Sequence, residues 1–344
     1  MKTKISFLLL AANLILLAGC RQDSTELIWD NGSYASFPSI ERFQGKYYVS
    51  FREGESHIFN SKGEADGKTR VLVSKDGRKW KSVAFMSKEG YDLRDPKLSV
   101  TPDGRLMVIM GGSVYKDRKL VRRIPQVSFS TDGIHFSDPE PVEFGPDITD
   151  DQEWIWRVTW HDGVGYAVTY SEYCGAHYAL LQTTDGRHYD RICELDIPRT
   201  SYPNETTVRF LDDGRMALMA RRDKEDCSGW WGISESPYTD WTWTPLGFRL
   251  GGPDFIVMPG GSIVAGTRSY FIPDKYKTIL LKGTGKGDFE EIAVLPSGGD
   301  CSYPGFLLEG KELWTVYYSS HELKNADGSP RAGIYLAKIP LNLL

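Results

Sequence analysis

Short apolar runs alternate with polar turns along most of the chain, and the runs come in pairs. Each run is four to seven residues long, is rich in β-branched and aromatic residues, and is joined to its partner by a turn that contains glycine. Turns such as Asp103-Gly104 and Asp213-Gly214 are typical of β-hairpins, because glycine tolerates the positive φ angles of tight turns. Six pairs follow one another: 37–43 with 46–51, 97–100 with 105–110, 154–160 with 164–170, 206–211 with 215–220, 255–258 with 262–267, and 303–308 with 312–318.

A second repeat runs in phase with these hairpins. The pattern Ser/Thr-x-Asp-Gly-x-x-aromatic occurs at 74–80, 130–136 and 183–189, and degenerate copies lie at 234–241 and 284–289. The Asp-Gly step favours a hairpin turn, the Ser/Thr and Asp side chains bind the local backbone, and the aromatic residue packs the turn onto its sheet. Self-similarity at a period of about fifty residues indicates a repeat architecture.

The two repeats together predict the fold. Each unit contains about four short strands, which is the content of one β-propeller blade. The sequence therefore predicts an all-β, six-bladed β-propeller with four-stranded antiparallel blades, formed as a single domain over 21–344 without a linker. A strand near Gly333 belongs to the sixth blade, and we expect an early strand at 27–29 to pair with that blade and close the ring.

The first twenty residues have a different character. Lys2 and Lys4 precede an apolar run over 5–17, which is short for a bilayer span and is typical of a signal peptide. The run ends in Leu17-Ala18-Gly19-Cys20, which resembles the bacterial lipobox. We expect residues 1–20 to be a lipoprotein signal, Cys20 to be lipidated, and the protein to be exported and anchored to a bacterial membrane, facing the periplasm or the outside. An ordinary signal peptide with a chance cysteine is the alternative.

Charge and cysteine content narrow the function classes. Without the signal, 39 basic and 46 acidic residues leave a net charge of about −7, and no basic run interleaves with aromatic residues, so nucleic-acid binding is not expected. Four cysteines remain, and their spacing is not that of a metal site, so we expect neither a metal nor a cofactor. Their disulfide pairing stays open; they are Cys174, Cys193, Cys227 and Cys301.

In a propeller the innermost strands of all blades meet at the axis, so the residues at their ends line one shared funnel. These positions are unusually polar here. Arginine forks bind carboxylates through two parallel hydrogen bonds, so an acidic sugar is a natural ligand for such a funnel. A structural salt bridge is the alternative for each arginine taken alone. The candidate substrate-binding residues are Arg52, Arg94, Asp95, Arg157, Arg221, Arg222, Asp254 and Arg268.

Three segments on successive predicted blades resemble the sialidase superfamily. Asn204-Glu205-Thr206-Thr207, with Arg221 further on, is similar to the family segment that carries a catalytic glutamate and an arginine of the carboxylate-binding triad. Gly266-Thr267-Arg268 stands where the next triad arginine is expected, and Asp300-Cys301-Ser302-Tyr303 resembles the segment with the tyrosine nucleophile. The Ser/Thr-x-Asp-Gly repeats resemble the Asp boxes, or BNR repeats, of the same superfamily. The resemblance covers nearly the whole chain after the signal.

The resemblance implies a retaining exo-glycoside hydrolase that removes a terminal acidic sugar such as sialic acid. Tyr303 would attack the sugar and Glu205 would take its proton, since a phenol with an ordinary pKa of about 10 is a weak nucleophile at neutral pH. The family takes its acid/base aspartate from a loop of the first blade, and Asp66 is the nearest match. The rivals of Asp66 in this loop are Glu53, Glu55 and Glu64.

The chain departs from the family on the first predicted inner strand. The first triad arginine precedes Ile-Pro there, whereas this chain reads Ala35-Ser36-Phe37-Pro38, which keeps the proline and lacks the arginine. Each charge-assisted hydrogen bond is worth roughly 1.5–3 kcal/mol, so the loss weakens carboxylate binding. Arg52, Arg94 and Arg157 are the arginines that could fill the space. A different acidic sugar, or a neutral one, is therefore an alternative to sialic acid.

Two further functions stay open. One is a glycosidase or polysaccharide lyase that acts on another acidic glycan through His57, His321 or Tyr318. The other is a non-catalytic glycan-binding surface lipoprotein, since propellers host many functions. A catalytic site requires Tyr303 and Glu205 within hydrogen-bond reach, whereas a binding protein requires only aromatic residues and arginines. In each case we expect a monomer whose partner is an anionic glycan.

Overall fold

The computed structural model describes residues 25–148, 152–171, 177–271 and 275–344. The predicted signal over 1–20, its lipidation site Cys20 and the cysteine Cys174 lie outside the described residues. The described chain is all-β, as the sequence predicts, apart from two short 3₁₀ turns at Arg199–Ser201 and Leu341–Leu343.

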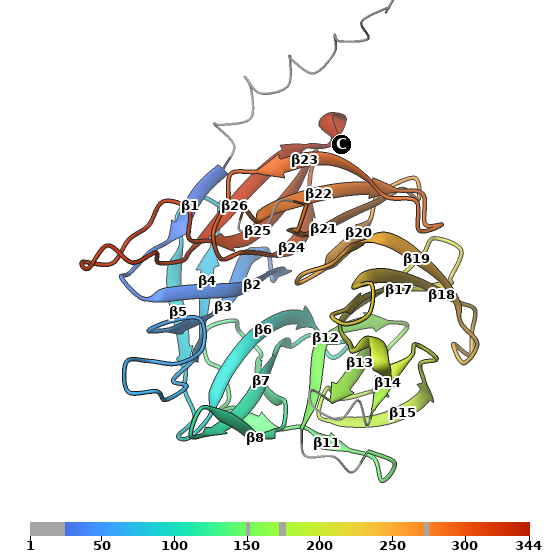
Figure 1. The fold of residues 1–344 in the computed structure, drawn as a ribbon, viewed down its shortest axis with the longest axis horizontal. Coiled ribbons are helices and arrows are strands. Elements are labelled where there is room, and N and C mark those ends of the chain that lie inside the picture. The colour runs from blue at the N-terminus through green and yellow to red at the C-terminus, as the bar shows by residue number, and fades with distance from the viewer. Residues whose placement is uncertain (1–24, 149–151, 172–176, 272–274) are drawn as a thin grey trace, which may run out of the picture.

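Six sheets stand around a common centre as the blades of a propeller (Figure 1). The inner strands are β2 (Tyr34–Phe43), β6 (Asp92–Val100), β12 (Glu153–His161), β16 (Pro203–Phe210), β20 (Asp254–Val257) and β24 (Cys301–Glu309). The second strands are β3 (Lys46–Gly54), β7 (Leu106–Lys116), β13 (Val164–Ser171), β17 (Met216–Arg222), β21 (Ile263–Ser269) and β25 (Glu312–Ser319). The third strands are β4 (Lys68–Ser74), β9 (Gln126–Ser130), β14 (Tyr178–Thr183), β18 (Ser228–Ser234), β22 (Lys277–Gly283) and β26 (Gly333–Pro340). The outer strands are β5 (Lys81–Met86), β10 (Glu140–Pro141), β15 (His188–Glu194), β19 (Thr242–Arg249), β23 (Glu290–Leu295) and β1 (Thr25–Trp29).

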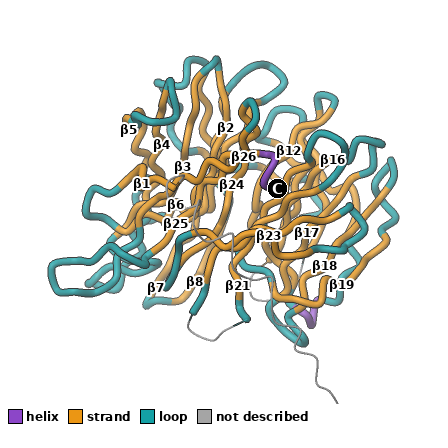
Figure 2. Tube along the Cα trace, turned by 90° about the horizontal axis from the view of Figure 1, so that it is seen from above, coloured by secondary structure: helices purple, strands orange, loops and turns teal. Residues whose placement is uncertain are grey.

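The ring is closed by the two ends of the described chain. Strand β1 pairs antiparallel with β26 and becomes the outer strand of the sixth blade, which confirms the predicted closure. The inner strands contact one another in the order β2, β6, β12, β16, β20 and β24, and β24 contacts β2 again. Figure 2 shows the same blades from above. The closed ring brings residues from all six blades to one axis.

The three Ser/Thr-x-Asp-Gly turns each join the third strand of a blade to its outer strand. In every copy the aspartate Oδ1 accepts two backbone N–H groups, and the Ser/Thr oxygen accepts the glycine N–H at 2.9 Å. The glycine lies against a side chain of the preceding blade. A Cβ on Gly133, for example, would lie 2.0 Å from the Tyr48 hydroxyl oxygen, and one on Gly77 would lie 2.1 Å from the Trp314 ring. These turns therefore dock one blade on the next.

Five of the six inner strands break their pairing register near their start. A β-bulge inserts an extra residue and re-aims the side chains around it. The regular hairpin pattern begins only after these polar, bulged starts, which is why most inner strands begin earlier than the apolar runs predict. The breaks lie at Ser36/Ser39, Arg94/Lys97, Ile155/Val158, Pro203/Thr206 and Ser302/Gly305.

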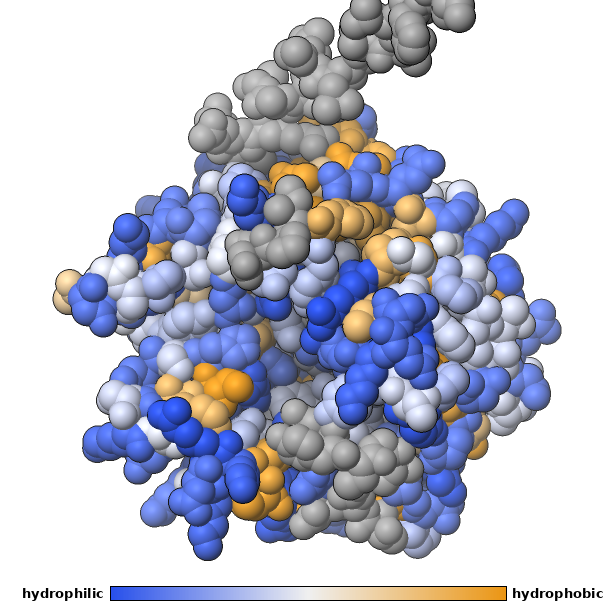
Figure 3. All heavy atoms as spheres, in the orientation of Figure 1, coloured by the Kyte–Doolittle hydropathy of each residue, from blue (hydrophilic) through white to orange (hydrophobic). Residues whose placement is uncertain are grey.

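Two blades exceed the predicted four strands. A short strand β8 (Lys119–Arg123) pairs with β7, and β11 (Glu143–Phe144) pairs in parallel with β15. Both additions lie at the margins of their sheets. Within the described residues, no helix is long and apolar enough to cross a membrane. Figure 3 shows that the face seen in Figure 1 is mostly hydrophilic, with small separate apolar patches.

Candidate active site

A cavity of about 220 Å³ lies at the bulged ends of the inner strands, and we call it the front cavity. Strands from four different blades line it. Its charged lining is balanced, because three arginines face three carboxylates. The residues that carry these charges are Arg94, Arg123, Arg221, Asp95, Glu205 and Asp223.

Tyr303 and Glu205 meet in the front cavity although 98 residues separate them in the sequence. The Tyr303 hydroxyl donates a hydrogen bond to Glu205 Oε1 at 2.6 Å. Arg221 Nη1 donates to Glu205 Oε2 at 2.6 Å and lies 3.4 Å from the Tyr303 oxygen. Burial, and then the negative charge of Glu205, raise the pKa of Tyr303 well above its ordinary value. The phenol is therefore neutral at neutral pH, and Glu205 is placed to accept its proton.

The backbone around this pair is held in unusual conformations. Ser302 and Tyr303 have φ angles of 102° and 54°, which lie in the left-handed region that non-glycine residues rarely adopt. Gly252 approaches from the neighbouring blade and donates its N–H to Glu205 Oε2 at 2.9 Å. A Cβ on Gly252 would lie 2.4 Å from the Tyr303 ring. Such positions persist only where the surrounding structure fixes them, as it does here between two blades.

Asp95 lines the same cavity. It stands in the bulge of β6 with φ of 51°, is only 6% exposed, and its Oδ1 has no hydrogen-bond partner among the described residues. Burial raises the pKa of Asp95, and the nearby Glu205 adds to this rise while Arg94 opposes it. A buried carboxyl with a free oxygen is suited to bind a sugar hydroxyl.

Two aromatic rings pack against Tyr303. The Phe37 ring lies 4.8 Å from it and the Trp156 ring 5.5 Å, measured between centroids. Phe37 occupies the stretch of β2 where the family arginine is expected, and the neighbouring Ser36 is fully buried. Of the three arginines suggested as replacements, Arg94 alone lines the front cavity, and its guanidinium lies 5.0 Å from the Phe37 ring.

Arg268 lies beside Tyr303, but it is bound by the protein itself. Its Nη2 donates to Asp300 Oδ1 at 3.1 Å and to the Tyr318 hydroxyl at 3.0 Å, and its Nε donates to the Cys301 carbonyl at 2.9 Å. Its guanidinium is 5.8 Å from the Tyr303 ring. A substrate carboxylate would therefore have to compete with Asp300 for Arg268.

Two other predicted arginines hold loops. Arg52 is fully buried and donates to Asp92 at 2.8 Å, to the Ser56 carbonyl at 2.7 Å and to the Ile58 carbonyl at 3.1 Å. Arg222 donates to Asp226, Glu225 and the Ser228 carbonyl at 2.7–3.0 Å. Neither residue lines the front cavity.

Arg157 and Asp254 line a different cavity, of about 300 Å³, further along the same inner strands. We call it the rear cavity. Asp254 accepts from Arg157 at 2.7 Å and from Arg209 at 2.7 Å, and it is 1% exposed. The structure therefore separates this ion-paired group from Tyr303 and Glu205.

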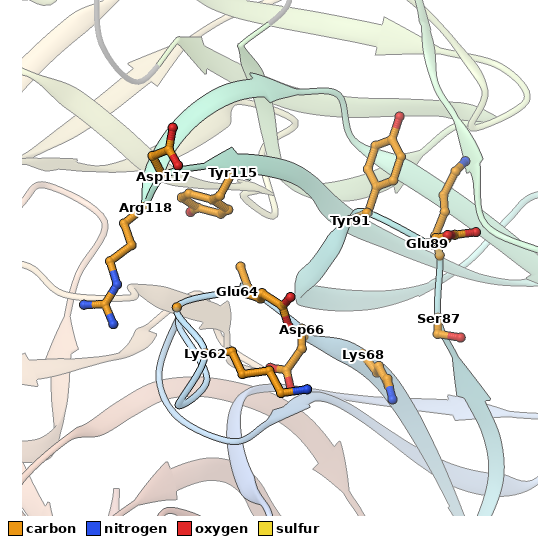
Figure 4. Close-up of a pocket in the computed structure, with 15 residues that line it drawn as sticks. Lys62, Glu64, Asp66, Lys68, Ser87, Glu89, Tyr91, Tyr115, Asp117 and Arg118 are labelled. Atoms are coloured by element: carbon orange, nitrogen blue, oxygen red, sulfur yellow. The ribbon is translucent and has the colours of Figure 1, made fainter.

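Asp66 lies in a cavity of about 780 Å³ that adjoins the front cavity at Tyr115. Figure 4 shows Asp66 and Glu64 on one loop of this cavity, with Tyr115 and Arg118 across from them. Its rivals Glu53 and Glu55 bind protein groups: Glu53 accepts from Trp29 at 2.6 Å, and Glu55 accepts from the Ser61 N–H at 2.8 Å. The front cavity contains none of these four carboxylates.

Sequence reasoning gave no role to Asp300, Tyr34 or Phe37. Asp300 stands directly before an inner strand, the position that also carries several of the predicted site residues, and this could have singled it out. Phe37 gave no signal, because an apolar residue in an apolar run looks like core. Within the described residues, no group of three or more His, Cys, Asp or Glu side chains is placed to hold a metal ion, and Cys193, Cys227 and Cys301 are free thiols.

Comparison with known proteins identifies relatives by fold. No family model matches the chain, and no curated protein matches it in sequence. A protein of unknown function from Dyadobacter fermentans superposes with a TM-score of 0.73 at 17% identity, over 93% of this chain and 99% of the other. The NanB sialidase of Streptococcus pneumoniae gives 0.68 at 10% identity, over 94% and 71%. An α-L-arabinanase of Penicillium chrysogenum gives 0.62 at 15% identity, over 90% and 94%. The chain thus has a six-bladed propeller fold similar to that of sialidases and other glycoside hydrolases.

Proposed function

We propose that this protein is a retaining, exo-acting glycoside hydrolase in which Tyr303 is the nucleophile and Glu205 is the base that activates it. The observation that carries the proposal is the 2.6 Å hydrogen bond from the Tyr303 hydroxyl to Glu205 inside the front cavity. A glycan-binding protein has no need for a buried tyrosine held against a carboxylate, so this pair favours catalysis.

Glu205 and Arg221 are placed to assist both the protonated and the ionised form of the Tyr303 hydroxyl. Glu205 takes the phenolic proton as the oxygen attacks the anomeric carbon, which removes the obstacle of the raised Tyr303 pKa. Arg221 lies close enough to the Tyr303 oxygen, at 3.4 Å, to stabilise negative charge that develops there. A covalent glycosyl-tyrosine intermediate leads to retention of the anomeric configuration.

Two classes of sugar follow from different observations. The sequence resemblance favours a terminal acidic sugar such as sialic acid, which Arg221, Arg268 and Arg94 would bind. The ion pairs favour a sugar without a carboxylate as the second candidate. Arg221 already binds Glu205 and Asp223, and Arg268 binds Asp300, so these guanidinium groups carry little uncompensated charge.

The test is hydrolysis of a glycoside panel by the purified protein. The panel contains aryl glycosides of sialic acid, of glucuronic acid and of neutral hexoses and pentoses, and the anomer of the first product is read by NMR. We expect one class to be cleaved with retention and Tyr303→Phe to lose at least about 10³-fold in kcat/KM. Tyr317→Phe is the matched control, because this buried hydroxyl donates to the Pro296 carbonyl at 2.8 Å outside the front cavity. Full activity of Tyr303→Phe would exclude the nucleophile assignment.

We also propose that Cys20 anchors the enzyme to a bacterial membrane. The lipobox-like ending Leu17-Ala18-Gly19-Cys20 supports this. Labelling of the full chain with radioactive palmitate in bacteria should be lost in Cys20→Ser. Equal labelling of both proteins would refute the anchor.

A further inference from the structure

The loop between β3 and β4 of the first blade brings a histidine to a carboxylate of the neighbouring sixth blade. His57 Nδ1 lies 2.5 Å from Asp300 Oδ2, although 243 residues separate the two in the sequence. Asp300 also accepts from the Tyr34 hydroxyl at 2.5 Å and from Tyr318 and Arg268 through its other oxygen. Burial alone would raise the pKa of Asp300, but these donors hold that pKa well below its usual range. Asp300 is therefore a fixed anion against one ring nitrogen.

The other ring nitrogen is available. Within the described parts of the chain, His57 Nε2 has no hydrogen-bond partner, and the side chain is 41% exposed. A carboxylate on Nδ1 fixes the ring orientation and favours the tautomer that leaves Nε2 facing outward for proton transfer.

His57 lies beside the front cavity, next to a residue that lines it, although its own side chain is not part of the lining. Its ring packs edge-on against Phe37 with centroids 5.0 Å apart, and Phe37 lies 4.8 Å from Tyr303. The next residue, Ile58, lines the cavity itself. Buried Arg52 binds the carbonyls on both sides of His57, those of Ser56 and Ile58, so the loop is anchored where the imidazole leaves it.

We infer that His57, oriented by Asp300, is the general acid and base that acts on the glycosidic oxygen. The inference rests on the proposed hydrolase. Position decides between His57 and the carboxylates, because in an exo-acting enzyme the leaving group points out of the pocket toward solvent. Asp95 lines the front cavity but is only 6% exposed, and Asp66 lies in the adjoining cavity, whereas the His57 side chain is 41% exposed to solvent.

The two steps balance as follows. In the first, the Tyr303 oxygen bonds to the anomeric carbon, its proton goes to Glu205, and the bond from the anomeric carbon to the glycosidic oxygen breaks. The glycosidic oxygen keeps the electron pair and takes a proton from His57 Nε2. In the second, a water oxygen bonds to the anomeric carbon and gives a proton to Nε2, while the bond to Tyr303 breaks and the phenolate recovers the proton from Glu205.

The dependence of the rate on the leaving group tests this role. Only a poor leaving group, whose oxygen is strongly basic, needs a proton from His57 to depart. For the sugar that wild-type protein cleaves in the panel, the 2,4-dinitrophenyl and methyl glycosides are compared. We expect His57→Gln to lower kcat/KM on the methyl glycoside by about 10²–10⁴-fold and on the dinitrophenyl glycoside by less than about tenfold. With His57→Ala and the dinitrophenyl substrate, sodium azide should accelerate turnover and yield a glycosyl azide, since azide needs no base.

The matched control is His135→Gln. His135 makes the same kind of bond, with Nδ1 2.6 Å from Asp132 Oδ2, but in an exposed turn of the second blade. It should leave both substrates unaffected. Equal losses on both glycosides in His57→Gln, no loss on either, or the selective loss in Asp66→Asn instead would each overturn the assignment of His57. A wild-type protein that cleaves no glycoside of the panel would overturn the proposed hydrolase itself. If activity is lost in Tyr303→Phe but kept in His57→Gln, the hydrolase proposal stands and only the acid/base role of His57 is overturned.

Discussion

The front cavity and the rear cavity are lined by the same inner strands, yet their charged groups have different partners. In the front cavity a tyrosine, a carboxylate and an arginine meet within 3.4 Å of one another. In the rear cavity two arginines share one carboxylate, Asp254, and no tyrosine is among the described residues that line it. Both ends are polar, so polarity alone does not mark the active end.

The backbone makes the difference. At the front, the bulges of five inner strands and the positive φ angles of Phe37, Asp95 and Tyr303 turn side chains toward the axis. At the rear, the same strands have regular register after their bulges, and side chains alternate between the two faces of the sheet. The irregular ends carry the residues of the proposed active site, while the regular ends continue the hairpin pairing of the blades.

The largest effect that separates the two ends is expected for Glu205→Gln. The amide keeps the shape of the side chain but cannot accept the Tyr303 proton, so kcat should fall by about 10²–10⁴-fold. Because Glu205 also pairs with Arg221, the free energy of unfolding should fall as well, so kcat is compared per folded molecule. Glu53→Gln is the matched control, since Glu53 is a buried glutamate bound to Trp29 and Arg70 away from the front cavity. A variant Glu205→Gln with normal kcat would show that the front cavity is not catalytic in the way proposed.

In the rear cavity, Asp254→Asn should lower the stability of the protein and leave its catalytic rate nearly unchanged. Arg157 and Arg209 then lose their shared carboxylate in a buried place, and breaking such a pair costs about 3–5 kcal/mol in the free energy of unfolding. Urea unfolding measures this loss, and kcat per folded molecule should stay near wild type. A large fall in kcat with unchanged stability would mean that Asp254 acts on substrate, as the sequence suggested.

The sequence predicted the fold well and the site only in part. Hairpin pairs and Asp-Gly turns are local signals, and they sufficed for six blades and for the closing strand at 27–29. The structure brings Glu205, Arg221 and Tyr303 into contact, while their catalytic and binding roles stay predictions. A salt bridge was the stated alternative for each arginine, but the sequence could not say which arginines make one. Arg157 and Arg222 do, with Asp254 and with Glu225 and Asp226. The hydrogen bond between His57 and Asp300 joins residues that are 243 positions apart in the sequence, and no local sequence pattern predicts it.

Lys97 lies on β6 between the two cavities. Charged residues of both cavities act on the pKa of its amino group. Its Nζ donates to the Phe37 carbonyl at 3.1 Å and lies 4.7 Å from the Trp156 ring. Burial, and then repulsion by Arg157, lower the pKa of Lys97 to about 7. Between pH 7 and 10.5 the unfolded state therefore binds more protons at this site, so the free energy of unfolding rises with pH by up to about 1.4 kcal/mol per unit. Below pH 7 this contribution is flat.

Lys97→Met should remove that rise. The measurement is urea unfolding of wild type and variant from pH 7 to 9.5, with the difference between the two taken at each pH. If the free energies of unfolding of wild type and Lys97→Met changed with pH in the same way, the pKa of Lys97 would be ordinary in the folded protein. The prediction would then be wrong.

The smallest expected effect belongs to Glu41, a carboxyl of the rear cavity. Its Oε1 accepts the Arg42 N–H at 2.8 Å, yet burial raises the pKa of Glu41 to about 7. Between pH 4.5 and 7 the folded state therefore binds more protons at this site than the unfolded state, so the contribution of Glu41 to stability falls as the pH rises through this window. Glu41→Gln keeps the acceptor and removes the titration, so the free energy of unfolding of the variant should equal that of wild type at pH 4.5 and exceed it increasingly as the pH rises to 7.

Asp95→Asn is the counterpart of that change in the front cavity and completes the comparison. Burial raises the pKa of both carboxyls, so both substitutions should stabilise the protein at alkaline pH. Only Asp95 faces the space beside Tyr303, so only Asp95→Asn should also raise KM for the cleaved glycoside. If Glu41→Gln changed KM as much as Asp95→Asn, the sugar would extend along the axis into the rear cavity, and the division of the inner strands into a reactive end and a structural end would have to be abandoned.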